Sequence, residues 1–191
     1  MANPSAERPL RADARRNRER VLKVAQEVFA AEGLSVPVHE IARRAGVGTG
    51  TVSRHFPTKH ELFKAILVER LDRYVLKAEA LMDSEDPGEA FFSFFSFVVL
   101  EGAMDRGLTE ALSEPGFDLA VITSDPDHDV MESLNRLLVR AQAAGTVRDD
   151  MEIADIKAIL VGCLSRHPAT DDGSAQRRLV EIACEGMRTR R

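Results

Sequence analysis

Two short helical patterns, separated only by the four residues AGVG, constrain the fold of this chain more than any other feature. The first pattern follows Pro37, a residue suited to the first turn of a helix, and extends to about Ala45. The second gives about two turns before Pro57 ends it. Gly46 can adopt the positive φ that the turn between them requires. Two helices joined in this way form a helix-turn-helix, whose second helix can enter the major groove of DNA.

The rest of the chain also predicts helices, because strand-like alternation of apolar and polar residues is essentially absent. An amphipathic helix is expected over residues 15–31, with Gly33 ending it, and a capping box of Thr58 and Glu61 begins a long fourth helix. Further helices are expected at about 87–103, between Gly107 and Glu114, and at about 130–144, 153–165 and 175–187. The predicted fold class is all-α with about nine helices, three of them in a helix-turn-helix domain.

Charge is distributed unevenly along the chain. The net charge of −5 divides into +5 for residues 1–59 and −10 for residues 60–191. A basic N-terminal part followed by an acidic C-terminal part is expected when only the first part of a protein binds phosphate groups. We therefore divide the chain into a flexible basic tail (1–14), a helix-turn-helix DNA-binding domain (15–60) and a ligand-binding and dimerisation domain (61–191). Five arginines near the start, Arg8, Arg11, Arg15, Arg16 and Arg18, either enter the adjacent minor groove or belong to a solvated, disordered tail.

Several classes of protein are disfavoured by what the sequence lacks. The first 16 residues have no apolar core of a signal peptide, and no apolar run is long enough to cross a membrane, so we expect no membrane contact and a cytoplasmic location. Residues 125–133 gather three aspartates and His128, but their spacing matches no metal site. Cys163 and Cys184 fall in predicted helices and are expected to be buried. Without a nucleophile motif or a glycine-rich phosphate loop, we expect no enzyme, no metal and no cofactor.

The second helix of the helix-turn-helix divides into an inner and an outer face. Val52 and Phe56, together with Val47 before the helix, are expected to fill the small core. The outer hydroxyl and methyl groups suit phosphates, base edges and thymine methyls. Lys59 is placed to bind a phosphate, whereas His39 either contacts a phosphate or simply lies at the surface. The candidate DNA-binding residues are His39, Thr49, Gly50, Thr51, Ser53, Arg54, His55 and Lys59.

The segment from Arg20 to about Ile66 resembles the N-terminal domain of the TetR/AcrR family of bacterial transcriptional regulators. The resemblance is carried by Ala-x-x-x-Phe in the first helix, Ile-Ala in the second, and the Gly-Val, Gly-Thr-Val, His-Phe and Lys that follow. It implies a homodimer whose two heads bind a near-palindromic double-stranded DNA operator. It also implies a small-molecule effector, as yet unknown, that spreads the heads and releases the DNA. A ligand-responsive repressor is therefore the expected function.

Three positions depart from the pattern of the family. Ser53 stands where the family usually has a tyrosine that reaches a phosphate, and Gly48 replaces the usual serine. Val36-Pro37 replaces the usual Thr/Ser pair before the second helix. The absence of one neutral hydrogen bond to a phosphate costs about 1 kcal/mol, so weaker operator binding is expected. The alternative function is a helical dimer that binds a ligand or a protein and has weak or lost DNA binding.

A phenylalanine-rich stretch, residues 91–99, marks the centre of the C-terminal domain. A helix that is apolar nearly all round is typical of a buried position, so these rings either pack a core or line an effector pocket. No charged residue lies at the centre of this helix, and we therefore expect an uncharged, hydrophobic effector. The candidate pocket residues are Phe91, Phe94, Phe95, Val98, Met104, Phe117 and Met131.

The last two predicted helices each carry an apolar stripe. Burial within one subunit would give the same pattern, but the resemblance implies that these helices pair with those of a second subunit in a four-helix interface. The candidate interface residues are Ile156, Ile159, Leu160, Cys163, Leu179, Ile182, Ala183 and Met187.

Overall fold

The structure, a computed structural model, describes residues 4–103, 105–113, 129–165 and 173–189. Across these ranges it contains nine helices and no strand, which confirms the predicted all-α class. The helices are α1 (Pro4–Glu32), α2 (Val38–Arg44), α3 (Thr49–His55), α4 (Lys59–Met82), α5 (Pro87–Ala103), α6 (Arg106–Ser113), α8 (Val130–Ala143), α9 (Ile153–Leu164) and α10 (Ser174–Met187).

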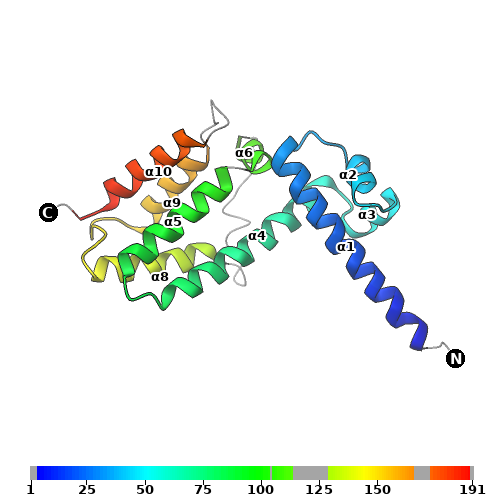
Figure 1. Cartoon of the computed structure of the whole chain (residues 1–191), viewed down its shortest axis with the longest axis horizontal. Helices are drawn as coiled ribbons and strands as arrows, with labels where there is room; N and C mark the ends of the chain where they lie inside the picture. The colour runs from blue at the N-terminus through cyan, green and yellow to red at the C-terminus, as the bar shows by residue number, and fades with distance from the viewer. Residues whose placement is uncertain (1–3, 104, 114–128, 166–172, 190–191) are drawn as a thin grey trace.

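The helices form two groups joined by α4. The short helices α2 and α3 pack against α1 at one end of the molecule, and this group is called the head (Figure 1). At the other end α8, α9 and α10 surround α5. α5 contacts α4, α6, α8, α9 and α10, so it is the central helix of the C-terminal domain. Phe91, Phe94 and Phe95 are all fully buried there. α4 belongs to both groups because it contacts α1 at its start and α5 and α8 further along.

Side-chain caps fix the starts of the two helices that follow the head. Thr58 Oγ1 accepts the Glu61 N–H at 3.1 Å, and Glu61 Oε2 accepts the Thr58 N–H at 3.0 Å, which is the capping box predicted for α4. Asp86 caps α5 by accepting the Glu89 N–H at 3.0 Å. α2 and α3 follow Pro37 and Gly48 and have no side-chain cap, so the positions of both helices depend on tertiary packing.

The first helix begins at Pro4, eleven residues before the predicted start at Arg15. The helix therefore continues through most of the segment that we expected to be a flexible tail. Alanine, arginine, leucine and glutamate in this segment are good helix formers. Pro9 lacks an N–H and removes only one hydrogen bond near the start of the helix. In Figure 1 the N-terminal half of α1 extends away from the rest of the molecule.

Candidate DNA-binding surface and effector pocket

A compact core fixes the orientation of α3. Val52 is fully buried and Phe56 is 5% exposed, and they pack with Leu22 of α1 and Ile41 of α2. The turn before α3 passes through Gly46 at φ +66°, a conformation that favours glycine. Because Val52 faces inward, the opposite side of α3 must face outward.

The outward side of α3 carries most of the predicted DNA-binding residues. Thr49, Gly50, Ser53 and Arg54 are exposed, whereas Thr51 and His55 are half-buried. Within the described part of the chain Arg54 has no ion-pair partner, so its guanidinium is available to an external anion. These side chains offer hydroxyl and guanidinium donors along one short helix, which suits a phosphate backbone and base edges.

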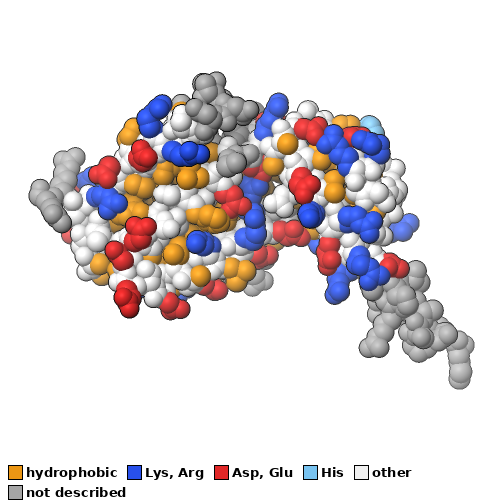
Figure 2. Space-filling view, viewed as in Figure 1, with side chains coloured by type: hydrophobic (Ala, Val, Ile, Leu, Met, Phe, Trp, Pro, Cys, Tyr) orange, Lys and Arg blue, Asp and Glu red, His pale blue; other side chains and the backbone are white. Residues whose placement is uncertain are grey.

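The other arginines of the helix-turn-helix are paired with acidic residues. Arg43 and Arg44 both donate to Glu40, with distances of 2.7 to 2.8 Å, and Arg44 also binds Glu32. Hydrogen bonds from Arg43 and Arg44 lower the pKa of the Glu40 carboxyl to about 2. Lys and Arg side chains are nevertheless frequent over the head and α1 (Figure 2). The two arginines of α2 are thus largely neutralised, which leaves Arg54 as the clearer anion-binding group.

Lys59 occupies a different environment from the one we expected. Its ammonium donates to the Leu34 carbonyl oxygen and lies 5.7 Å from the centre of the Phe29 ring. The side chain is half-buried between the end of α1 and the start of α4. This nitrogen already binds the protein, so the geometry favours a structural role for Lys59 over the predicted phosphate contact. His39 is exposed on α2, as both predicted roles require.

Three of the five arginines considered for the minor groove contact the protein itself, and the side chains of the other two, Arg8 and Arg11, lie outside those that the structure describes. Arg15 lies 3.5 Å from Glu19, Arg16 pairs with Asp13, and the Arg18 guanidinium lies 5.4 Å from the centre of the Phe56 ring. These three arginines lie on α1, so any of them that enters the minor groove would do so as part of a helix.

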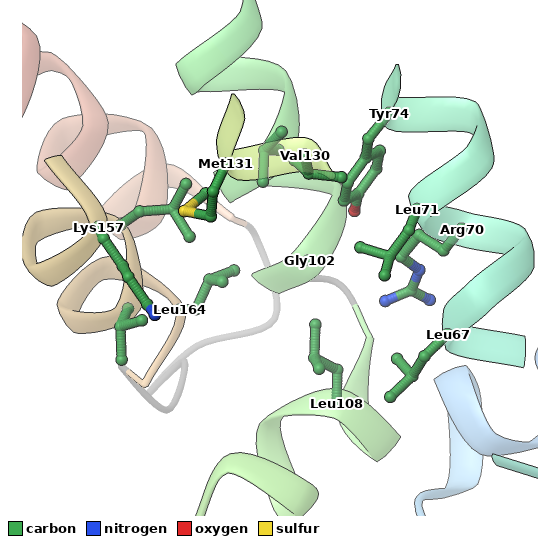
Figure 3. A pocket seen from close by; sticks show the side chains of 13 residues that line it. Leu67, Arg70, Leu71, Tyr74, Gly102, Leu108, Val130, Met131, Lys157 and Leu164 are labelled. Carbon is green, nitrogen blue, oxygen red and sulfur yellow. The ribbon is translucent and has the colours of Figure 1, made fainter. Parts of the chain in front are cut away.

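A cavity of about 50 Å³ lies between α4, α5, α6, α8 and α9 in the C-terminal domain (Figure 3). Most of its wall is aliphatic. Its lining residues are Leu67, Arg70, Leu71, Tyr74, Val98, Gly102, Leu108, Val130, Met131, Lys157, Leu160, Val161 and Leu164.

Only two of the predicted pocket residues line this cavity, namely Val98 and Met131. Phe91, Phe94 and Phe95 are fully buried elsewhere, because they lie in the core around α5. Met104 and Phe117 lie outside the described residues. The core alternative for the phenylalanine-rich helix therefore fits the structure better than the pocket alternative.

Sequence reasoning missed the polar residues of the cavity, which come from α4 and α9. Arg70 and Tyr74 project from consecutive turns of α4, and Lys157 projects from α9 on the opposite wall (Figure 3). The signal for the first two was present in the sequence. They share the buried face of α4 with Leu67 and Leu71, where an arginine is unusual.

Arg70 forms a buried ion pair that also connects the cavity to α6. Its Nη2 donates to Asp105 Oδ2, and both side chains are 5% exposed. Burial disfavours the charged guanidinium, but Asp105, together with Tyr74 and Glu101, outweighs burial and raises the pKa of Arg70. Asp105 Oδ1 accepts the Leu108 N–H at 2.8 Å and so caps α6.

Helix α6 in turn contacts the DNA-binding head. Glu110 Oε2 accepts the Leu34 N–H at 2.7 Å, directly after Gly33, which has φ +80°. Gly107 approaches α1 so closely that a Cβ there would lie 3.1 Å from the Phe29 carbonyl oxygen. A continuous set of contacts therefore joins the cavity, α6 and the end of α1.

The predicted interface residues on α9 and α10 divide into two groups. Ile156, Leu160, Cys163 and Met187 are buried within the single chain, because their stripe faces α5. Ile182 is 67% exposed, and Ile159, Leu179 and Ala183 are half-buried. Gly162 and Gly186 also face open space, since a Cβ at either position would meet nothing within 4 Å. Only the second group offers an apolar surface for a partner.

The remaining expectations concern groups outside this surface and the cavity. In the described ranges, no three His, Cys, Asp or Glu side chains gather into a metal-binding group, and residues 125–128 of the predicted acidic loop lie outside those ranges. Cys163 and Cys184 are buried thiols, as expected, and burial raises the pKa of both. Among the described helices, none is long and apolar enough to span a membrane.

Two family descriptions match most of the chain. Residues 21–66 match the bacterial regulatory proteins of the tetR family, and residues 86–189 match the C-terminal domain of SbtR-like transcriptional regulators. The first match covers α2, α3 and most of the predicted resemblance, and the second covers the domain that contains the cavity.

Known proteins are similar in both sequence and structure. The crystal structure of a TetR transcription regulatory protein from Mycobacterium vanbaalenii is 48% identical, with a TM-score of 0.67, and the match covers 95% of this chain and 100% of that one. The TetR transcriptional regulator SCO0520 from Streptomyces coelicolor is 29% identical over 91% of this chain and 99% of its own, with a TM-score of 0.63. The HTH-type transcriptional regulator SAUSA300_2515 from Staphylococcus aureus (strain USA300) is 32% identical over 75 residues, which are 39% of this chain and only 40% of that protein.

Proposed function

The chain belongs to the TetR family of bacterial transcriptional regulators, and from that premise we propose that it is a homodimeric repressor released from its operator by a small molecule. Regulators of this family bind DNA and are not enzymes. The observation that carries the proposal is the outer face of α3, where Ser53 and Arg54 are exposed beside Thr49 while Val52 is buried.

The proposed dimer uses the exposed side of α9 and α10. Ile182 and its half-buried neighbours Ile159, Leu179 and Ala183 form an apolar strip, and Gly162 and Gly186 let a second pair of helices approach closely. Two chains packed in this way present two α3 helices, as a near-palindromic operator requires.

The proposed response to an effector uses the contacts between the cavity and the head. A molecule that enters the cavity contacts α4, whose first residue, Lys59, binds the Leu34 carbonyl oxygen. It also contacts Leu108 of α6, and Glu110 of that helix binds the Leu34 N–H. Both contacts meet at Leu34, just after α1. A shift of α4 or α6 therefore changes the separation of the two DNA-binding domains in a dimer.

A second candidate function is a ligand-responsive dimer with weak DNA binding. Ser53 in place of a longer side chain and the uncapped start of α3 at Gly48 favour it. Ser53→Tyr distinguishes the two candidates, because one added phosphate hydrogen bond of about 1 kcal/mol tightens operator binding by about fivefold in each head. Ser53→Phe, which adds the ring without the hydroxyl, is the matched control. If the unchanged protein shows no specific DNA binding and the Ser53→Tyr variant does, the second candidate is favoured.

Selection of binding sites from random duplex DNA tests the proposed function. We expect a near-palindromic site, with half-sites about one helical turn or somewhat more apart, and binding that falls steeply as salt rises. Enrichment of no sequence, together with weak binding at physiological salt, would contradict the proposal.

A further inference from the structure

Two buried polar groups on one wall of the cavity have unused hydrogen-bonding capacity. Arg70 is 5% exposed and Tyr74 is 4% exposed, and both point into the cavity from α4 (Figure 3). Arg70 Nε and Nη1 and the Tyr74 hydroxyl have no hydrogen-bond partner among the residues the structure describes. Burial raises the pKa of Tyr74, so the hydroxyl remains a donor at physiological pH. Burying an unpaired donor is costly, and a ligand acceptor would remove that cost.

The charge of the cavity wall favours an acceptor that is negative. Arg70 and Lys157 are the charged lining residues, both are cationic, and no acidic side chain is among the thirteen residues of the lining. Asp105 binds Arg70 from outside the lining and occupies only Nη2. Arg70 is paired with Asp105, and Glu101, the other carboxylate that acts on Arg70 and Tyr74, is paired with Arg73. Lys157 is therefore the lining cation that has no ion pair among the described residues.

We propose that the effector is an amphipathic monoanion, a molecule with one carboxylate-type head and an apolar body. The head accepts hydrogen bonds from the Tyr74 hydroxyl and from one unpartnered N–H group of Arg70, at Nε or Nη1, and the body contacts the aliphatic side chains of Leu67, Leu71 and Leu108. This proposal replaces the uncharged effector expected from sequence. It rests on the proposed function only for its consequence at the operator.

The cavity must widen to admit such a molecule. Its volume of about 50 Å³ is well below the roughly 300 Å³ of pockets that bury larger ligands. Met131 and Lys157 are unbranched and half-buried, so they can move aside at little cost. The wall formed by Arg70 and Tyr74 is buried and packed, and it therefore stays fixed as the site of the head group.

A negative head group bound to Arg70 would repel Asp105, which binds the same guanidinium through Nη2. Asp105 Oδ1 caps α6 through the Leu108 N–H, and Glu110 of α6 binds Leu34 at the end of α1. Weakening the Arg70–Asp105 pair loosens the start of α6, and α6 is a direct contact of the head. Effector charge is thereby linked to the position of the DNA-binding helices.

Calorimetric titration of the purified full chain with octanoate, octan-1-ol and octylamine tests the proposed ligand class. The three probes share a chain length and differ in head group. We expect octanoate to bind at least tenfold more tightly than octan-1-ol, and octylamine to show no binding. Equal affinities for octanoate and octan-1-ol, or no binding of octanoate, would overturn the proposal.

Two substitutions test whether the carboxylate of octanoate binds at the cavity wall formed by Arg70 and Tyr74. Tyr74→Phe removes a hydroxyl that has no partner among the described residues, so the fold is retained, yet octanoate should bind about tenfold more weakly. Ser133→Ala, which removes a buried hydroxyl outside the lining, should leave the affinity unchanged. Asp105→Asn keeps an acceptor for the Leu108 N–H and removes the competing charge, so octanoate should bind about fivefold more tightly. Unchanged affinity in both Tyr74→Phe and Asp105→Asn would refute the assigned site.

The binding titration contains no DNA, so it decides the ligand class by itself. Release of operator DNA by octanoate is measured separately, by fluorescence anisotropy. Octanoate binding without operator release retains the ligand class and contradicts effector-driven release. Operator binding without octanoate binding contradicts the ligand class and retains the DNA-binding function.

Discussion

Replacing Lys59 with methionine distinguishes a residue that holds the start of α4 against the end of α1 from one that binds DNA. Methionine keeps most of the aliphatic side chain but removes the ammonium that donates to the Leu34 carbonyl oxygen and lies 5.7 Å from the Phe29 ring centre. A hydrogen bond from a charged donor contributes about 1.5–3 kcal/mol and an exposed cation–π contact about 0.5–1 kcal/mol. We therefore expect Lys59→Met to lower the free energy of unfolding by about 2–4 kcal/mol, which corresponds to a fall in Tm of roughly 4–16 °C.

The matched control for this prediction is Arg54→Met. Arg54 is exposed on α3 and has no ion pair in the described ranges, so its removal should leave the Tm unchanged. The substitution should instead reduce the slope of log Kd against log salt by about 0.9 for each phosphate that is no longer neutralised, hence about 1.8 for two heads. Thermal unfolding and salt titration of operator binding measure the two effects. If Lys59→Met leaves the Tm unchanged and reduces the salt slope, the structural role assigned to Lys59 is wrong.

Three further substitutions test other parts of the structure. Gly33→Ala should destabilise the fold by more than the roughly 1–2 kcal/mol expected for Gly46→Ala, since both have positive φ but only a Cβ at Gly33 would meet the Glu110 carboxylate; thermal unfolding compares them. Ile182→Glu should dissociate the dimer in sedimentation experiments, whereas Val139→Glu, at the similarly exposed surface of α8, should not. Burial alone would raise the pKa of Glu110, but the Leu34 N–H and Arg106 lower it, so its contribution to stability is lost as pH falls below its ordinary pKa of 4.5. Glu110→Gln should therefore lower the free energy of unfolding at pH 7 and make it decrease less steeply as the pH falls in acid unfolding experiments. The same pH dependence of stability in the variant and the unchanged protein would contradict this.

Local signals in the sequence are sufficient to predict the helices and the head. The Thr58–Glu61 capping box and the glycine at residue 46 act within a few residues, so the elements that they define appear where they were expected. The start of α1 was placed too late because arginines and prolines suggested a tail, although most residues there favour a helix.

The cavity and the contacts of Leu34 depend on segments that are distant in the sequence. Lys59 follows the helix-turn-helix, but its partner Leu34 is 25 residues away, and no local pattern brings the two together. The phenylalanine-rich helix correctly indicated the centre of the domain, yet the polar side chains of the cavity come from α4 and α9. On α9 and α10 an apolar stripe cannot reveal which side is covered by α5, and the structure divides the predicted residues accordingly.

The central claim is that the outer face of α3 reads a specific DNA sequence as part of a dimer. The most direct measurement is the affinity for the selected operator and for a scrambled duplex of equal length at physiological salt, with the number of chains bound per duplex. The proposed function predicts two chains per operator and an affinity at least about a thousandfold higher for the operator than for the scrambled duplex. Equal affinities for the two duplexes would contradict the claim.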